Sequence, residues 1–331
     1  MVEEGNKEFK EALQSFVEIT GTDEACARFF LEDAGGDIQK AIENFQEAGS
    51  EIPELKDVLP KKIVDTAQSF GLGQKSSALT CTMLSWNVDG LDSANLKSRF
   101  IAVCYIISKI SPDIVFLQEL TPCLGNDLRE MLGGEYSILL ALPKQPYFTA
   151  VLLKPTIDYV SHSCFPFTTS HMGRAMETVE LSLYLFITAY IGGKKLRLLN
   201  THLESGRDSR EVRKAQLKEC FDQLKKWDDN ETFIIFGGDL NLRDEEVSDI
   251  PDGFKDAWIA CGSNAKHKYT WDMALNDNKS FPFKARNRFD RIFFNNGAAY
   301  SSVDFALEGQ NRLKTGLCFP SDHWAVVVTF Y

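Results

Sequence analysis

Two hydrophobic periodicities divide this chain into a short N-terminal part and a much longer C-terminal part. Over residues 1–49, apolar side chains recur every three or four positions, for example at Phe9, Leu13 and Phe16, which is the spacing of one face of an amphipathic helix. A Thr-Gly-Thr turn and a Gly-Gly pair interrupt the pattern, and Asp37 after the second break suits a helix N-cap. This segment therefore predicts a small bundle of three helices.

The next stretch, residues 50–78, has the composition of a linker. Pro53, Pro60, Gly71 and Gly73 punctuate it, and it contains one weak helical pattern. We therefore expect a connection between two domains here.

From residue 79 onward, strand-like patterns alternate with a few helical ones. Continuous apolar runs such as residues 113–117 are typical of strands buried on both faces. We expect strands at residues 79–88, 113–117, 151–154, 178–191, 195–199, 232–236, 289–294 and 324–330, and helices at residues 96–110 and 210–227. Mixed strands and helices over this length predict one α/β domain spanning residues 79–331.

The charge of the chain is unevenly distributed. The 331 residues include 36 basic and 47 acidic side chains, a formal net charge of −11. The first 50 residues alone hold 12 acidic and 4 basic side chains. The larger domain is therefore close to neutral, which permits a local basic groove for a polyanion.

The sequence favours neither export nor membrane insertion. The N-terminus lacks the basic start and apolar core of a secretory signal, and no apolar run is long enough to span a bilayer. The eight cysteines include no Cys-x-x-Cys pair, so neither a disulfide framework nor a zinc site is supported. We expect a protein of a reducing compartment that is not secreted and has no membrane partner.

Reactive side chains stand at the ends of several predicted strands, where active sites are usually assembled. They are Asn87, Glu119, His202, Ser205, Asp239, Asn241, Asp322 and His323. Any one of them alone is more often a buried polar residue paired with a neighbour. Together they supply hard oxygen ligands for a divalent cation, an acid–base pair and donors for phosphate oxygens. This set predicts metal-assisted hydrolysis of a phosphodiester.

The order of these motifs, WN, LQE, THLES, GDLN and SDH, resembles the endonuclease/exonuclease/phosphatase superfamily over residues 79–331. The resemblance implies an α/β fold of the DNase I type, a two-sheet sandwich flanked by helices. Within the superfamily, the segments SWNVDGLD, GDLNLRD, YTWD, RFDRIFF and PSDHW are similar to those of the tyrosyl-DNA phosphodiesterases that act on 5′ ends. This implies Mg²⁺-dependent hydrolysis, with Mn²⁺ as an alternative ion, of the 5′-phosphotyrosyl bond between a topoisomerase II tyrosine and a DNA end. The product would be a 5′-phosphate, and the process DNA repair in the nucleus, with the cytoplasm as a second location.

The helical N-terminal segment resembles the ubiquitin-associated (UBA-like) domains, which members of that family also carry. Its first loop is Ile19-Thr20-Gly21, which differs from the Met-Gly-Phe or Met-Gly-Tyr loop common among such domains. The resemblance implies ubiquitin or a ubiquitylated protein as a partner, and a docking bundle without ubiquitin affinity is the alternative.

The resemblance also implies a role for each site residue. Glu119 matches the principal metal ligand, with Asn87 beside it on metal or phosphate and Asp322 linked to the metal from further out. Asp239 matches the residue that activates the attacking water, and Asn241 the residue that positions it.

Further residues match groups that stabilise the reacting phosphorus. His202 and His323 match the hydrogen-bond donors, Asp290 the partner that orients His323, and Ser205 a phosphate contact.

Substrate choice is expected to rest on two aromatic and two basic residues. Trp271 and Phe289 match aromatic residues along the DNA path, where an unpaired base can stack on them, although Phe289 also fits a buried strand position. Arg243 and Arg288 are candidates for DNA phosphates. Arg174 follows a Met-Gly pair, but the residues after it, Ala-Met-Glu-Thr, depart from the expected pattern, which leaves its place open.

Two other functions remain compatible with the sequence. One is a different phosphodiesterase of the same fold, such as an apurinic endonuclease, an RNA deadenylase or a phosphoinositide phosphatase. The other is an adaptor that binds ubiquitin and DNA without turnover.

Overall fold

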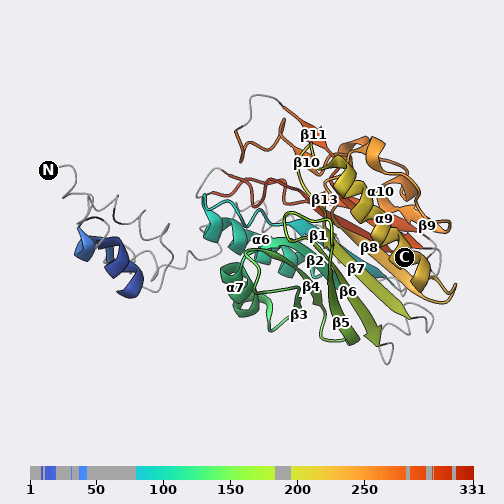
Figure 1. Cartoon of the computed structure of the whole chain (residues 1–331), viewed down its shortest axis with the longest axis horizontal. Helices are drawn as coiled ribbons and strands as arrows, with labels where there is room; N and C mark the ends of the chain where they lie inside the picture. The colour runs from blue at the N-terminus through green and yellow to red at the C-terminus, as the bar shows by residue number, and fades with distance from the viewer. Residues whose placement is uncertain are drawn as a thin grey trace. The chain divides into compact units, whose positions relative to one another are not determined.

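The computed structural model describes residues 80–182, 195–280, 284–295, 300, 302–314 and 318–331, together with residues 9, 12–19, 31 and 37–42. The chain separates into two compact units, Met1–Asp57 and Val58–Tyr331 (Figure 1). The predicted linker, residues 50–78, lies outside the described residues.

In the N-terminal unit, residues 12–19 and 38–42 are helical. Asp37 caps the second of these stretches, because its Oδ1 accepts the backbone N–H groups of Gln39 at 3.0 Å and Lys40 at 3.1 Å. A small apolar cluster contains Leu13, Phe16, Leu31, Ala41 and Ile42. Most of the predicted middle helix lies outside the described residues.

The C-terminal unit is built on two six-stranded sheets, as the predicted sandwich requires. In chain order its elements are β1 (Cys81–Asn87), α6 (Leu96–Ile110), β2 (Ile114–Leu120), α7 (Pro122–Leu132), β3 (Ser137–Leu140), β4 (Phe148–Leu153), β5 (Asp158–Pro166), β6 (Ala175–Ser182), β7 (Leu196–His202), α9 (Arg210–Trp227), β8 (Phe233–Asp239), η1 (Asp244–Glu246), β9 (Phe254–Asp256), α10 (Ala257–Ala260), η2 (Ala265–His267), β10 (Trp271–Asp272), β11 (Arg286–Asn287), β12 (Asp290–Asn295), β13 (Val303–Glu308) and β14 (Ala325–Phe330). The strand order is β13-β14-β1-β2-β4-β3 in the first sheet and β5-β6-β7-β8-β12-β9 in the second, and β10 pairs with β11 separately. The predicted α/β sandwich is confirmed.

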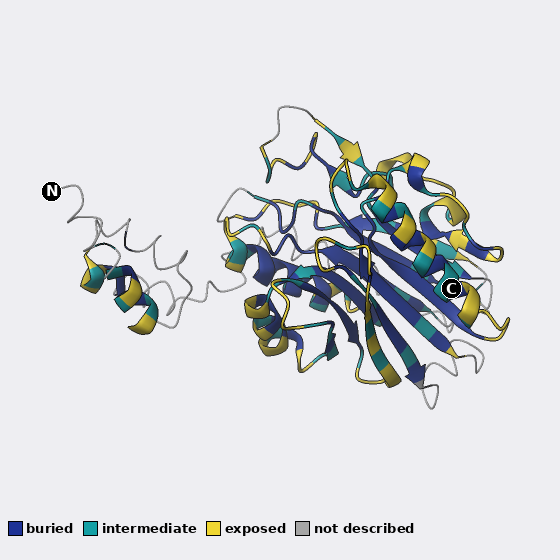
Figure 2. Ribbon diagram, in the orientation of Figure 1, coloured by how far each residue is buried: buried dark blue, intermediate teal, exposed yellow. Residues whose placement is uncertain are grey.

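Alternate residues of the central strands pack against different layers, which explains their continuous apolar sequences. Phe116 and Ile235 belong to the core between the two sheets. Leu117 belongs to the cluster under α6 and α7, and Phe236 to the cluster under α9. Figure 2 shows the resulting layers, with buried strands in the middle and exposed positions on the outer faces of the helices. No described helix has both the length and the hydrophobicity to cross a membrane.

Strand direction brings the predicted site residues to one edge of the sandwich. β1 runs parallel to β2, and β7 runs parallel to β8, so each pair ends together. β12 and β14 run antiparallel to them, so Asp290 at the start of β12 lies opposite Asp239 at the end of β8. The close approach of β7 and β8 here depends on Gly238, where a Cβ would lie 1.9 Å from the Thr201 carbonyl oxygen.

Candidate active site

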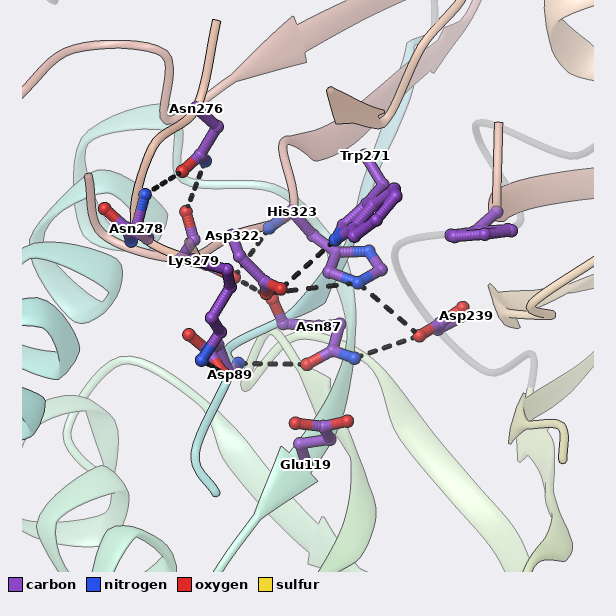
Figure 3. A network of polar contacts seen from close by, with 12 residues as sticks. Asn87, Asp89, Glu119, Asp239, Trp271, Asn276, Asn278, Lys279, Asp322 and His323 are labelled. Atoms are coloured by element: carbon purple, nitrogen blue, oxygen red, sulfur yellow. Dashed lines mark hydrogen bonds and ion pairs between the residues drawn. The ribbon is translucent and has the colours of Figure 1, made fainter. Parts of the chain in front are cut away.

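Asp239 is the centre of the polar site. Its Oδ2 accepts a hydrogen bond from Asn87 Nδ2 at 2.9 Å and lies 3.2 Å from His202 Nε2 and 3.9 Å from His323 Nε2 (Figure 3). Its Oδ1 accepts the backbone N–H of Asn241 at 3.0 Å. Burial alone would raise the pKa of Asp239, but the two histidines and the Asn87 amide outweigh burial and lower it. The carboxylate is therefore ionised and held in a fixed orientation.

His202 has a defined tautomer because Arg174 contacts it from the far side. Arg174 Nη1 donates to His202 Nδ1 at 2.6 Å, so the proton of the neutral ring sits on Nε2 and is donated to Asp239. Burial and the Arg174 charge lower the pKa of His202 to about 4. Near neutral pH, His202 is a neutral donor, and Arg174, whose place the sequence left open, belongs to the site.

His323 is oriented by Asp290 and, unlike the neutral His202, is protonated. His323 Nδ1 lies 2.8 Å from Asp290 Oδ2, and both side chains are buried. Burial opposes protonation, but Asp290, Asp239 and Asp322 outweigh it and raise the pKa of His323 well above its ordinary value. Its Nε2 lies 3.9 Å from Asp239 Oδ2 and 4.0 Å from Asp322 Oδ1, too far for a hydrogen bond to either. This N–H is available to a ligand in the space between them.

Glu119 reaches the site through an irregular backbone. The register of β2 with β4 shifts between Leu117 and Leu120, and Glu119 has a φ of 60° in the left-handed region. Such a conformation is uncommon for a residue with a side chain and is found at functional positions. Gly90 packs on this bulge, because a Cβ there would lie 2.0 Å from the Glu119 carbonyl oxygen. The bulge turns the carboxylate toward Asn87 and Asp239, as Figure 3 shows.

The electrostatics of Glu119 fit a divalent cation. Burial, followed by the negative charges of Asp322 and Asp239, raises the pKa of Glu119 to about 7. His202 Nε2 lies 3.9 Å from Glu119 Oε1, beyond hydrogen-bond distance. A divalent cation would relieve the repulsion between these carboxylates. Carboxylate oxygens are also the hard ligands that Mg²⁺ prefers.

A second set of potential ligands lies nearby. Among the described residues, one oxygen or nitrogen from each of Asp239, Asp290 and His323 lies within 4.8 Å of the other two. Two members of this set, Asp290 and His323, already hydrogen-bond to each other. The site thus contains a second acidic cluster that could hold a metal ion, in addition to Glu119.

Aromatic rings form one wall beside these groups. The rings of Trp271 and Phe289 lie 5.5 Å apart at 40°, and Phe289 lies 6.4 Å from the His323 ring. Trp271 Nε1 donates to Asp322 Oδ2 at 3.2 Å, and Trp271 also forms a backbone bridge with His323. Both aromatic side chains are half-buried, so neither is a core residue.

Comparison with known proteins identifies both parts of the chain. The endonuclease/exonuclease/phosphatase family matches residues 84–323, and a UBA-like domain matches residues 10–51. A Caenorhabditis briggsae protein named 5′-tyrosyl-DNA phosphodiesterase is 40% identical over 337 residues, covering 100% of this chain and 93% of that protein. The chain belongs to the tyrosyl-DNA phosphodiesterase 2 family. It is a phosphodiesterase of the endonuclease/exonuclease/phosphatase superfamily, whose members are metal-dependent.

Two further relatives support this identification. Rat tyrosyl-DNA phosphodiesterase 2 is 34% identical over 338 residues, covering 95% of this chain and 88% of the rat protein. The crystal structure of Danio rerio TDP2 complexed with single-strand DNA product matches with a TM-score of 0.70 and 33% identity, covering 76% of this chain and 99% of that one.

Two residues predicted to contact the substrate lie outside the Asp239 network. Ser205 Oγ is 3.2 Å from the Met172 sulfur. Arg243 caps the short helix η1, where its backbone N–H and its guanidinium both donate to Glu246, at 3.2 and 3.3 Å. Its side chain is 31% exposed, so it can still reach a ligand.

The prediction that Arg288 contacts DNA needs correction. Arg288 is buried, and its guanidinium donates to Asp256 at 2.6 Å and to Asp244 at 3.2 Å. Arg291 joins the same two carboxylates. Asp256 is buried, whereas the Asp244 side chain is 47% exposed. The buried Arg288 guanidinium therefore forms a structural ion pair, and moving it to reach a phosphate would remove the shortest ion pair of the buried Asp256.

Sequence reasoning missed a buried polar network that joins the sheets next to the site. Gln118 Nε2 donates to Asn200 Oδ1 at 2.9 Å, and Asn200 Nδ2 donates to Glu177 Oε2 at 2.9 Å. Glu177 also accepts from Thr149 at 2.7 Å and pairs with His162 at 2.9 Å. The sequence signal for this network was Glu177, an acidic residue at an inward strand position that is normally apolar.

Proposed function

We propose that this chain hydrolyses the 5′-phosphotyrosyl bond between a topoisomerase II tyrosine and a DNA end, uses Mg²⁺, and leaves a 5′-phosphate. The observation that carries the proposal is the ionised Asp239 carboxylate, fixed by Asn87 and flanked by one neutral and one charged histidine. Two Caenorhabditis relatives are named 5′-tyrosyl-DNA phosphodiesterases, which supports DNA as the substrate and the 5′-tyrosyl linkage as the bond that is hydrolysed.

In this proposal Asp239 orients the attacking water and accepts its proton as the new P–O bond forms. Because the pKa of Asp239 is lowered, the carboxylate is ionised throughout the neutral range. The charged His323 then donates its Nε2–H to a phosphate oxygen, whose negative charge grows in the transition state. The Nε2–H of His202, which Asp239 accepts in the free site, would be shared with a second phosphate oxygen. The Asn87 amide keeps Asp239 Oδ2 in place during the attack.

The leaving group in this reaction is a tyrosine phenolate. A phenol has a pKa near 10, so its oxygen leaves without the full protonation that an alkoxide would need. Fixed positive charge beside the phosphate therefore suffices, and the imidazolium of His323, oriented by Asp290, supplies it.

Glu119 would be the main residue to hold the metal, with Asp322 linked to it, and Mn²⁺ is the alternative ion. We favour Glu119 over the Asp239, Asp290 and His323 set because Asp290 and His323 already hydrogen-bond to each other. A bound Mg²⁺ would add Lewis-acid charge for the phosphoryl oxygens.

The DNA would enter as a single-stranded 5′ end. Trp271 and Phe289 offer half-buried aromatic faces beside the site, and an unpaired base stacks on such a face with about 1–3 kcal/mol. The single-strand product held by the Danio rerio relative is consistent with this path. Arg243 is the remaining candidate for a DNA phosphate.

The N-terminal domain would bind ubiquitin or a ubiquitylated protein, and the protein would act in the nucleus. The match of residues 10–51 to a UBA-like domain supports the first statement, and family resemblance is the basis of the second. We place the domains at residues 1–49 and 79–331, joined by residues 50–78.

Deleting residues 1–50 is expected to remove ubiquitin capture and to leave turnover unchanged. Lost turnover would instead give this segment a role in catalysis or folding.

The proposal is tested by release of tyrosine from a single-stranded oligonucleotide that carries a 5′-phosphotyrosine. We expect release with Mg²⁺, none with EDTA, and none from the Asp239→Asn variant. Cleavage of an abasic duplex in preference to the tyrosyl end would retain the fold and overturn the substrate. DNA binding without any turnover would support an adaptor instead.

A further inference from the structure

Lys279 forms ion pairs with two aspartates next to the site, Asp89 and Asp92. It lies in the segment that follows β10, and its Nζ donates to Asp89 Oδ1 at 2.8 Å and also to Asp92 Oδ2. Figure 3 shows Lys279 reaching down to Asp89 beside Asn87. Its side chain is only 24% exposed. Because two carboxylates already hold the ammonium group, Lys279 is poorly placed to contact a phosphate itself and acts through the residues that it joins.

One side of this bridge is a rigid turn. Arg99 donates to the carbonyl oxygens of Asp89 at 3.0 Å and Asp92 at 2.6 Å, and it pairs with the Asp89 carboxylate at 3.3 Å. The backbone N–H of Asp89 also donates to Asn87 Oδ1 at 2.9 Å. The turn that Lys279 contacts is therefore fixed to helix α6 and to a residue that touches Asp239.

The other side of the bridge is the segment between Trp271 and Lys279. Asn276 Nδ2 donates to the Ser321 carbonyl at 2.9 Å, and Asn278 Nδ2 donates to the Phe319 carbonyl at 2.9 Å. These bonds attach the segment to the residues just before His323. Lys279 adds an attachment in a different direction, to the turn after β1.

Each of the two joined parts exposes a large apolar side chain. Leu91 on the turn is 53% exposed, and Leu275 on the segment after β10 is 60% exposed. With Trp271 at the start of the second part, they give both parts apolar side chains that can contact the faces of unpaired bases.

We propose that Lys279 is a positioning residue for the DNA strand, whose bridge to Asp89 and Asp92 holds Leu91 and Leu275 where nucleotides next to the tyrosyl phosphate pass. This role rests on the proposed function, since it assumes a DNA strand at the site. It predicts that Lys279 affects the binding of DNA and not the chemical step.

The test compares Lys279→Met with Lys279→Arg. Arg312→Met is the matched control, because Arg312 forms a 2.7 Å ion pair with Asp277 on the same segment, between two exposed side chains. The first readout is the Kd of a 5′-phosphorylated single-stranded oligonucleotide by fluorescence anisotropy in EDTA, which requires no turnover. The second is kcat and KM on a 5′-tyrosyl oligonucleotide and on a small aryl ester of thymidine 5′-phosphate. Thermal melting of each variant accompanies both.

For Lys279→Met we expect Kd and KM for DNA to rise about five- to tenfold, with kcat and turnover of the small ester within about twofold of the starting protein. Lys279→Arg should restore most of the affinity, and Arg312→Met should leave it unchanged. An unchanged Kd, an equal loss on the small ester, or failure of arginine to rescue a folded protein would overturn the proposal. If the unaltered protein binds DNA but releases no tyrosine, the proposed function fails while the effect of Lys279 on Kd remains measurable.

Discussion

Asp290 and His323 are joined across the two sheets by a 2.8 Å contact between Oδ2 and Nδ1. Asp290 opens β12 in one sheet, and His323 precedes β14 in the other. The pair therefore ties the two halves of the sandwich together at the edge where Asp239 lies. It also sets which nitrogen of His323 faces the ligand.

Replacing Asp290 by asparagine is expected to leave the fold intact and to reduce kcat by about 10²- to 10⁴-fold, because an amide does not stabilise the charged imidazole. KM should change little. Steady-state kinetics on the 5′-tyrosyl oligonucleotide checks this, with Asp222→Asn on the exposed face of α9 as control. A kcat equal to that of the control would remove Asp290 from the orienting role.

The assignment of Glu119 to the metal predicts the behaviour of Glu119→Gln. Loss of the carboxylate should abolish the stimulation of turnover by Mg²⁺, with a decrease on the order of 100-fold or more. Binding of Mn²⁺, measured by calorimetry, should weaken in parallel, and Glu130→Gln on the exposed surface of α7 serves as control. If Mg²⁺ still stimulates the variant, the metal site is assigned to Asp239, Asp290 and His323 instead.

Trp271 is predicted to bind the strand more than the reacting phosphate. Trp271→Ala should raise KM about tenfold for a tyrosyl oligonucleotide, in keeping with the loss of stacking on one base, while KM for a small phosphotyrosyl ester changes little. The comparison is made with oligonucleotides of increasing length. Equal losses on both substrates would show that Trp271 supports the site through its hydrogen bond to Asp322 and not through DNA.

The His162–Glu177 pair predicts a loss of stability at alkaline pH. Contacts with the Cys164 sulfur and the Glu177 carboxylate raise the pKa of His162 to about 9. A raised pKa means that the folded protein holds this proton more tightly than the unfolded chain does. The stabilisation is therefore complete below pH 6.5 and disappears as the pH rises through 9, with an upper value of about 3 kcal/mol.

Urea unfolding between pH 6 and 10 measures this contribution. We expect the free energy of unfolding to fall across that interval in the unaltered protein, and His162→Gln to flatten the curve and lower its acid side. A parallel decline in both proteins would assign the pH dependence to other groups.

The sequence by itself determined the two domains, the alternating layers and much of the site. The apolar run before Asp239 marks a buried strand, and the polar residues after it mark its end, since both signals are local. The resemblance of the motifs to those of the superfamily supplied Asn87, Glu119, His202, Asp290 and His323. The parallel pairs β1–β2 and β7–β8 bring the first three of these residues to one edge.

Only the tertiary structure decided which partners the basic side chains have. Arg288 has the sequence context of a DNA contact, yet it is buried between Asp244 and Asp256. Arg174 and Lys279 have no distinctive context, yet one sets the tautomer of His202 and the other joins the segment after β10 to the turn after β1. The physical reason is that periodicity reports only whether a side chain faces in or out. The partner of a buried charge depends on the register of strands far apart in the chain.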